Sequence, residues 1–216
     1  IGDPVRAARE QYSLALTTIN VGQGVGAVQW ARERGARPGA AVQLSPRPIN
    51  LGPAVPIDES NAMARLGNNG QSITYSGRQR VWLMDGDGSH RANDVEVDVV
   101  AGEGASLTVL DATGERFLSW FVPTMGCCSS LAGTGLQFYT YQSSDEIAGR
   151  SASVVEAHGD GYLTARWWLD DETGLPLWVE RYNMTGNPTL VFGFVSISIG
   201  KILRYVALVY GVSFFL

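Results

Sequence analysis

The chain has 216 residues, with 16 basic and 21 acidic side chains, which gives a formal net charge of −5. Its length fits one domain, or one domain with appendages, and is enough to bury a real core. A hydrophobic fraction of 45%, together with 26 glycines and 9 prolines, is typical of a turn-rich globular protein and excludes a disordered tail or a coiled coil. The acidic balance, with Lys201 as the single lysine and no basic run, argues against nucleic acid as a partner.

The first 57 residues combine an expected helix with an irregular segment. Asp3-Pro4 is a typical helix start, and apolar residues then recur at spacings of three and four, which predicts a short amphipathic helix over 3–19. Residues 33–57 contain too many glycines and prolines for regular structure. The chain begins without methionine or a leader-like segment, so we expect that a signal peptide was removed or that the numbering begins inside a precursor.

A second short helix and a run of strands follow. Asp58, with Ala62 and Leu66 after it, predicts a helix that ends at the glycine- and asparagine-rich residues 67–70. From Gln71 onward the apolar period changes to two and turn residues recur, which predicts a meander of antiparallel hairpins. The expected strands are 71–84, 94–101, 105–111, 115–122, 136–142, 151–158, 161–169, 176–183 and 189–199.

The end of the chain is strongly apolar. Residues 205–216 carry no charge, and Lys201 and Arg204 lie just before them. A membrane-spanning helix needs about 20 apolar residues, and this run is shorter. Two interpretations remain open: a last strand or helix buried in the domain, or a short membrane anchor with the two basic residues at one interface. For an anchor, the residues expected to contact the membrane are Tyr205, Leu208, Val212, Phe214 and Phe215.

A glycine-rich segment at 22–27 matches the G-x-G-x-x-A form of a dinucleotide-binding fingerprint. Its context does not fit, because no clean buried strand precedes it, no acidic residue follows at about 20 positions and no βαβ unit is present. We therefore interpret the segment as a glycine-rich turn and expect no nucleotide or other cofactor.

Side chains for metal binding or catalysis are sparse. Cys127 and Cys128 are neighbours, whose side chains in an extended chain point to opposite faces, so with His90 and His158 they make a poor zinc set. We expect two small thiols in a turn, with a disulfide between them as an alternative. The acidic run at 170–172 lies between two strands and is expected to build a turn. No metal site, catalytic residue or enzymatic activity is predicted.

Aromatic residues are concentrated in the expected strands. In 162–169, alternation separates an apolar series with Ala165 and Trp167 from a mixed series with Arg166 and Trp168. Most such residues form a core, but a strongly curved sheet with an apolar concave face can also hold a lipid chain or an apolar segment of a partner. From alternation and hairpin position, the residues expected to line such a groove are Trp82, Trp120, Phe138 and Trp168.

Three groups of segments carry a resemblance to a known family. They are ARL at 64–66 with ITYSGRQ at 73–79; IAGR at 147–150 with ASVVEA at 152–157; and ARWWLD at 165–170 with TGLPL at 173–177 and ERY at 180–182. The last group resembles the W-x-D…TG-L-P-L hairpin of the MucB/RseB family of sigma-E regulatory proteins, most closely its actinobacterial branch, within the LolA/LppX lipoprotein-carrier superfamily. The resemblance covers about two thirds of the chain, from Ala62 to Gly200.

This resemblance implies a mostly β, α+β fold in which an open antiparallel half-barrel wraps around one or two short helices. It also implies export beyond the cytoplasmic membrane. Members of the family bind the extracytoplasmic part of a membrane-bound anti-sigma factor, and they have a hydrophobic groove for lipid or misplaced lipoprotein; their relatives carry lipids or lipoproteins. The first 57 residues, the cysteine pair and the apolar C-terminus depart from the family pattern.

The sequence thus predicts three parts: an N-terminal helix and irregular segment over 1–57, a LolA-like β domain over 58–200, and an apolar segment over 201–216. The expected function is that of a non-catalytic regulator or sensor in the cell envelope that binds an apolar ligand or an anti-sigma-factor-like membrane partner. A lipid or lipoprotein carrier is one alternative. An extracytoplasmic accessory subunit of a membrane-protein complex is another.

Overall fold

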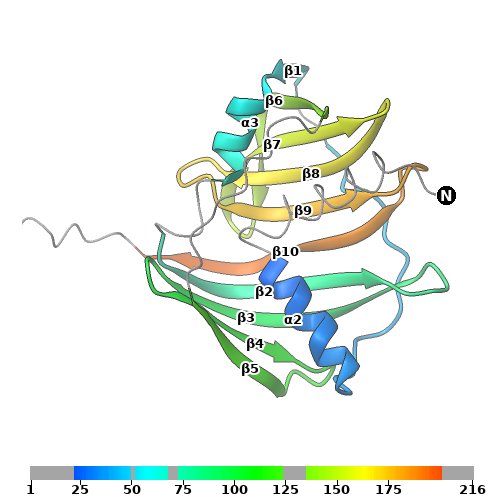
Figure 1. Ribbon diagram of the computed structural model, residues 1–216, viewed down its shortest axis with the longest axis vertical. Coiled ribbons are helices and arrows are strands. Elements are labelled where there is room, and N and C mark those ends of the chain that lie inside the picture. Colours follow the sequence, from blue (N-terminus) through cyan, green and yellow to red (C-terminus); the bar gives the residue numbers. More distant parts are fainter. Residues whose placement is uncertain (1–21, 50–51, 68–72, 124–134, 201–216) are drawn as a thin grey trace, which may run out of the picture.

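The computed structural model describes residues 22–49, 52–67, 73–123 and 135–200 (Figure 1). The helix expected over 3–19, the cysteine pair and the apolar residues 201–216 lie outside the described residues. Within the described part, one open antiparallel sheet of ten strands curves around two short helices. The mostly β, half-barrel fold predicted from the sequence is therefore confirmed.

The sheet consists of two meanders joined in its middle. Its strand order is β1-β6-β7-β8-β9-β10-β2-β3-β4-β5, so the last strand pairs with the second and the chain neighbours β5 and β6 are far apart in the sheet. The strands are β1 (Ala54–Ile57), β2 (Tyr75–Met84), β3 (His90–Val100), β4 (Gly104–Leu110), β5 (Arg116–Pro123), β6 (Gln137–Ile147), β7 (Arg150–Gly159), β8 (Tyr162–Asp170), β9 (Pro176–Tyr182) and β10 (Pro188–Ile199).

The helix α2 (Gly22–Glu33) packs against β2, β3 and β4. The expectation of a glycine-rich turn at 22–27 is wrong, because these residues form the first half of this helix. The reason is close packing: a Cβ atom at Gly24 would come within 2.8 Å of Oε1 of the buried Gln79. Ala27 and Ala31, on the same helical stripe, are also buried, so small side chains let α2 approach the sheet.

The helix α3 (Glu59–Gly67) covers the other end of the sheet and packs against β6. Its start agrees with the sequence prediction: the Asn61 amide donates to Oδ1 of Asp58 at 2.8 Å, a typical N-cap. Ala62 and Leu66, four residues apart, are buried on its sheet-facing side.

Residues 36–49, which we call the strap, connect the two halves of the molecule. The strap leaves the end of α2, bonds to β3 through the Gly39 amide and the Ala92 carbonyl at 2.8 Å, and forms a bridge between Val42 and His90. It then reaches Arg47, whose amide donates to the carboxylate of Glu180 on β9. The strap is irregular, as predicted, but the strand β1 at 54–57 is an addition that the sequence did not indicate.

Candidate binding faces of the sheet

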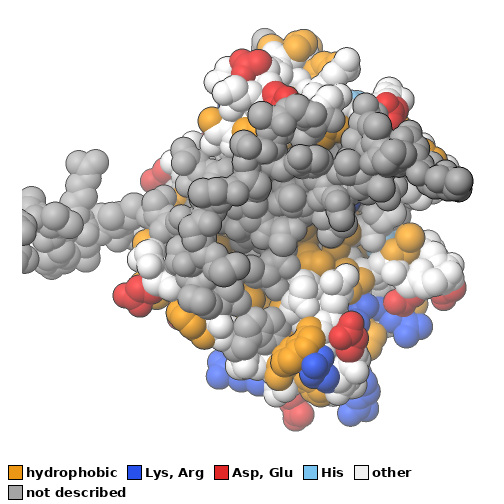
Figure 2. Space-filling view, in the orientation of Figure 1, with side chains coloured by type: hydrophobic (Ala, Val, Ile, Leu, Met, Phe, Trp, Pro, Cys, Tyr) orange, Lys and Arg blue, Asp and Glu red, His pale blue; other side chains and the backbone are white. Residues whose placement is uncertain are grey.

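Two faces of the sheet can be told apart by what packs on them. Residues opposite one another in neighbouring strands lie on one face, and the face alternates along each strand. The inner face is the side of α2 and α3: α2 meets Gln79, and Arg65 of α3 donates to Oγ1 of Thr140 at 3.4 Å. The outer face is the side of the strap, where Arg47 meets Glu180. In the space-filling view from the side of α2, apolar and charged side chains of the described residues are visible together in the lower part of the molecule (Figure 2).

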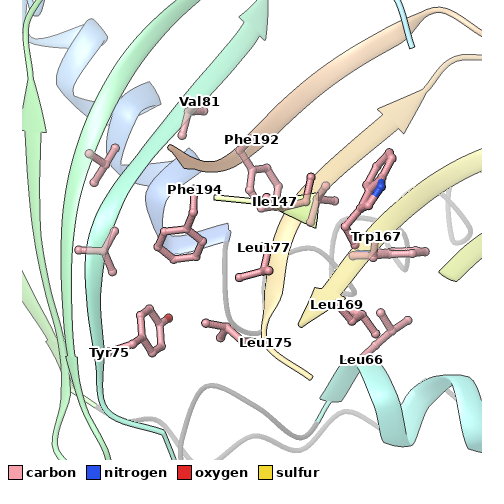
Figure 3. Close-up of a cluster of buried hydrophobic side chains, with 14 of the residues drawn as sticks. Leu66, Tyr75, Val81, Ile147, Trp167, Leu169, Leu175, Leu177, Phe192 and Phe194 are labelled. Carbon is pink, nitrogen blue, oxygen red and sulfur yellow. The ribbon is translucent and has the colours of Figure 1, made fainter. Parts of the chain in front are cut away.

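Large apolar side chains converge on the inner face between the two helices (Figure 3). They come from β8, β9, β10 and the turn between β8 and β9, and each is almost fully buried. Tyr75 meets this group from β2, with its ring edge-on to Phe194 at 5.9 Å between centroids. We call the following residues the central cluster: Trp167, Leu169, Leu175, Leu177, Phe192 and Phe194.

The outer face of the same strands carries a buried network of charges. Register places Glu156 opposite Arg166 and Arg166 opposite Glu180, so three strands contribute one member each. Arg166 donates through Nε to Oε1 of Glu156 at 2.7 Å, and its Nη1 lies 4.0 Å from Oε2 of Glu180. His158 donates to the other oxygen of Glu156 at 2.9 Å, and Tyr182 donates to Glu180. Each carboxylate thus has several donors.

The strap closes over this network through one residue. The Arg47 amide donates to Glu180, its carbonyl accepts from Nη1 of Arg166 at 3.2 Å, and its Nε donates to Oδ2 of Asp145 at 3.2 Å. Its guanidinium also lies 5.9 Å and 5.7 Å from the ring centroids of Trp168 and Trp178, within cation–π range. Arg47 therefore anchors the strap by backbone, charge and aromatic contacts at once.

Burial and hydrogen bonding shift the pKa values of Glu156 and Asp145 in opposite directions. Burial alone would raise the pKa of Glu156, but bonds from His158, Tyr141 and Arg166 outweigh it and lower that pKa. In Asp145 the same burial effect is outweighed by the Glu146 amide and Arg47, which lower its pKa. These acids are therefore ionised at neutral pH, which suits anchoring rather than proton transfer.

The predicted groove residues do not all lie together. Phe138 is buried on the inner face beside the strand position of Thr140. Trp82 and Trp168 lie on the outer face: Trp82 contacts the Trp178 ring at 5.4 Å between centroids, and the fully buried Trp168 donates from Nε1 to Asp145 at 3.1 Å. For Trp120 only the backbone is described, and it pairs with Leu107. A ligand role for these four residues stays a prediction.

The remaining sequence-derived candidates can also be placed. The membrane-contact residues Tyr205, Leu208, Val212, Phe214 and Phe215 lie outside the described residues. Across the part of the chain that the structure describes, no helix is long and apolar enough to cross a membrane, and no group of three metal-ligating side chains occurs. His90 and His158 have separate partners, the Pro188 carbonyl and Glu156. Asp170 builds the predicted turn by accepting from the Thr173 amide at 2.8 Å.

Sequence reasoning missed the outer-face network and the role of Arg47. Its members are far apart in the chain, and only the strand register brings them together. One signal was present: Arg166 is the single charge among the aromatic and apolar residues of 162–169, and a charge in such a place is rarely buried without a partner.

No protein-family model matches the chain. No curated protein matches it. Among solved structures, the chain is similar to MucB in complex with MucA(peri), with 20% identity over 67% of this chain and 56% of that chain and a TM-score of 0.48.

Two further solved structures illustrate the range of similarity. One is the Pseudomonas aeruginosa MucA/MucB complex, with 16% identity, coverage of 67% of this chain and 58% of that chain, and a TM-score of 0.48. The other is a LolA superfamily protein from Nitrosomonas europaea, with 10% identity, coverage of 61% and 85%, and a TM-score of 0.24. The chain spans just over half the length of the MucB chains it matches. At these identities and TM-scores, the similarity carries no argument about activity.

Proposed function

We propose that this chain is a non-catalytic, extracytoplasmic binding protein whose inner face accepts an apolar ligand such as an acyl chain. The observation that carries the proposal is the central cluster. Six large apolar side chains converge there on the face between α2 and α3. On the opposite face of β8 and β9, Arg166 and Glu180 belong to a network of bonded polar side chains.

The chemistry of the inner face suits an acyl chain better than a polar metabolite. Burying one CH2 group contributes about 0.8 kcal/mol, so a chain of about ten carbons can offset a substantial cost of opening the site. The central cluster is buried in this structure, so binding requires that its side chains move apart. The ligand then restores the apolar contacts that this movement removes.

Binding of 11-(dansylamino)undecanoic acid, followed by its fluorescence, tests the proposal. Leu177→Asn places a polar group in the central cluster and is expected to weaken binding at least tenfold. Val191→Asn is the matched control, because Val191 is also buried but pairs with Trp82 and Glu180 on the outer face. Thermal melting of both variants establishes that they are folded under the conditions used.

The same binding assay also tests which face of the sheet holds the ligand, because the predicted groove residues Trp82 and Trp168 lie on the outer face. If Trp82→Ala or Trp168→Ala weakens binding and Leu177→Asn does not, the ligand lies on the outer face and the proposal is wrong. If none of the variants binds the probe less tightly, the probe is held elsewhere on the protein.

We further propose that the protein acts as a regulator that contacts a membrane-bound partner, as in the sigma-E regulators that segment 165–182 resembles. One of the solved MucB structures is a complex with MucA(peri). The corresponding experiment is gentle purification from native membranes, followed by mass spectrometry of bound lipids and proteins. A stoichiometric anti-sigma factor supports the regulator, whereas stoichiometric lipid alone supports a carrier. A carbonate-resistant assembly with unrelated membrane subunits supports the accessory-subunit alternative.

A further inference from the structure

We propose that the side chains around Arg47 on the outer face form a recognition site for an arginine in an extended segment of a partner protein, and that the strap occupies this site until the partner displaces it. The proposal is independent of the ligand proposed for the inner face. It rests on a site that is assembled without the strap, and on the exposure of the strap that covers it. We call the following residues the arginine site: Asp145, Trp168, Trp178 and Glu180.

The members of the arginine site are held in place by partners other than the strap. The indole of Trp168 donates to Oδ2 of Asp145 at 3.1 Å, and the indole of Trp178 donates to Oε1 of Glu180 at 3.0 Å. Tyr182 also donates to Glu180. Each carboxylate is therefore oriented by one of the two indoles. A site that is preorganised in this way does not need its occupant to keep its geometry.

The arginine site contacts both the side chain and the backbone of the residue that it holds. The Arg47 guanidinium donates from Nε to Asp145 at 3.2 Å and lies within cation–π distance of both indoles. The Arg47 amide donates to the two oxygens of Glu180 at 3.1 and 3.3 Å, and its carbonyl accepts from Arg166 at 3.2 Å. A carboxylate beside aromatic rings suits a guanidinium, and paired backbone contacts suit an extended peptide.

The charges on the outer face also favour a cationic occupant. Glu156 and Glu180 share the guanidinium of Arg166. The cation that pairs with Asp145 is Arg47. Displacement of the strap removes this cation and uncovers Glu180, and a partly buried carboxylate that loses its partner is costly. A segment that brings its own arginine replaces both contacts, whereas an uncharged or acidic segment does not.

The strap has few buried contacts that oppose its release. None of the residues 37–49 is fully buried. Bonds to β3 hold the first half of the strap at Gly39 and Val42. The second half is held by the bonds of Arg47 and by the partly buried Ile49. Segments of this kind open at a low free-energy cost, and the elements that move on binding are drawn from them.

The strap also shows which kind of segment fits the site. Arg47 lies between Pro46 and Pro48, and a proline restricts the residue before it to extended conformations. A segment that is already extended loses less conformational entropy when it binds. The occupant is therefore an arginine followed by a proline in an exposed, extended part of another protein.

Binding of a fluorescently labelled peptide with the sequence of residues 43–49, QLSPRPI, tests the proposal by fluorescence anisotropy. In the full chain with Arg47→Ala, the strap no longer fills the site with a guanidinium. The peptide is expected to bind this variant about tenfold more tightly than the unchanged chain, in which the closed strap competes. A peptide in which alanine replaces the arginine is the control and is expected to bind about tenfold more weakly than the arginine peptide.

A second substitution tests the position of the site. Asp145→Asn, added to Arg47→Ala, removes the charge that pairs with the guanidinium and is expected to weaken peptide binding about tenfold. Glu146→Gln in the same background is the matched control. It removes the same charge from an exposed neighbour that is bonded to Arg47 through its backbone carbonyl, so peptide binding is expected to stay unchanged.

Thermal melting of each variant establishes that it is folded. If Arg47→Ala is unfolded, Arg47→Lys takes its place, because it keeps a cation in the strap and gives up the planar guanidinium. The peptide is then expected to bind Arg47→Lys about threefold more tightly than the unchanged chain.

Three results would overturn the proposal. The first is a folded Arg47→Ala or Arg47→Lys variant that binds the peptide no more tightly than the unchanged chain. The second is equal binding of the arginine and alanine peptides. The third is an Asp145→Asn variant that binds the peptide as tightly as Glu146→Gln does. A dimer of the unchanged chain that Asp145→Asn dissociates would assign the site to the strap of a second copy, and a different protein as the occupant would be wrong.

Discussion

On the inner face, Leu177 and Trp167 of β9 and β8 pack against other apolar side chains, whereas on the outer face of these two strands Glu180 and Arg166 are bonded in a buried network. Apolar packing is non-directional and tolerates a volume-conserving change. A buried charge network is directional, and each member depends on its partners. The comparison shows two ways in which one set of strands is stabilised, one on each face.

The outer face also fixes the strand register. A shift of β8 by one residue would move Arg166 into the central cluster and Trp167 onto the strap side, since successive side chains alternate between faces. Apolar side chains on the inner face alone would resist such a shift less, because neighbouring Trp168 is also apolar. We infer that the network restricts β8 to one strand register, and that the central cluster supplies most of the hydrophobic stabilisation.

The largest expected effect is that of removing one member of the network. Glu180, which is 2% exposed, accepts from the Arg47 amide, Trp178 and Tyr182. Glu180→Ala leaves these donors and Arg166 without that acceptor and is expected to lower the free energy of unfolding by about 3–5 kcal/mol. Urea denaturation measures the loss.

The control for this substitution is Glu172→Ala, which removes an exposed carboxylate bonded to Arg150. An exposed ion pair of this kind is worth less than about 1 kcal/mol. Equal losses in the two variants would mean that the network contributes no more than a surface ion pair. The two faces would then differ less than the geometry indicates.

The second prediction concerns the central cluster. Leu177 is fully buried, and Leu177→Ala is expected to lower the free energy of unfolding by about 3 kcal/mol, through lost transfer energy and the cavity that remains. Leu83→Ala is the control, because Leu83 is only partly buried at the margin of the core. Chemical denaturation of both variants decides the point, and a loss below about 1 kcal/mol for Leu177→Ala would show that the inner face is loosely packed.

The third prediction concerns a glycine that the outer face requires. A Cβ atom at Gly193 would lie 2.1 Å from Cε3 of Trp178, so the indole rests directly on the β10 backbone. Gly193→Ala is expected to cost about 1–3 kcal/mol by overpacking and to change the near-ultraviolet circular dichroism of the Trp82–Trp178 pair.

Gly26→Ala is the matched control for Gly193→Ala. Nothing lies within 4 Å of a Cβ atom at Gly26 in α2, so this change is expected to stabilise the helix by about 0.5–1 kcal/mol. If both substitutions shift the urea midpoint in the same direction, the contact of Trp178 with Gly193 is not a packing constraint.

The strands and helices could be predicted from the sequence where the pattern that specifies them is local. The nine strands from β2 to β10 follow from alternation and turn residues, which are local. The strand β1 escaped prediction because four residues with Pro56 carry too little alternation. The helix α2 escaped because Gly22, Gly24 and Gly26 lower helix propensity, and only packing against Gln79 explains the glycine at position 24.

The sequence predicted that the sheet has two different faces, but it did not predict all the residues that lie on each face. Alternation in β8 correctly separated Trp167 from Trp168 onto two faces. It could not say which face is concave, because that depends on where α2 and α3 pack. The contact of Arg47 with Glu180 joins residues 133 positions apart, and no local pattern encodes it.

The smallest expected effect is the dependence of the free energy of unfolding on pH. The pKa values of Glu156 and Asp170 are lowered, because bonds from His158 and Arg150, among others, outweigh the effect of burial. A lowered folded-state pKa adds stability above the unfolded value of about 4, and this is lost as pH falls through the folded value. From pH 7 to 5 the change is expected to stay below about 0.5 kcal/mol, with a steeper loss at lower pH.

Burial raises the pKa values of tyrosines on both faces: Tyr75 on the inner face, and Tyr141 and Tyr182 on the outer face. Burial raises the pKa of Tyr75 to about 12, so its neutral form contributes stability below the unfolded value of about 10, and this is lost as pH rises from 10 through 12. Urea midpoints from pH 3 to 12 should therefore fall at both ends. Glu156→Gln is expected to make the acid limb less steep. Tyr75→Phe is expected to make the alkaline limb less steep and to leave the acid limb in place, while Tyr141 and Tyr182 still contribute to the alkaline limb. If Tyr75→Phe flattened the acid limb instead, the two faces would not be stabilised independently, because inner and outer side chains would then titrate as one coupled group.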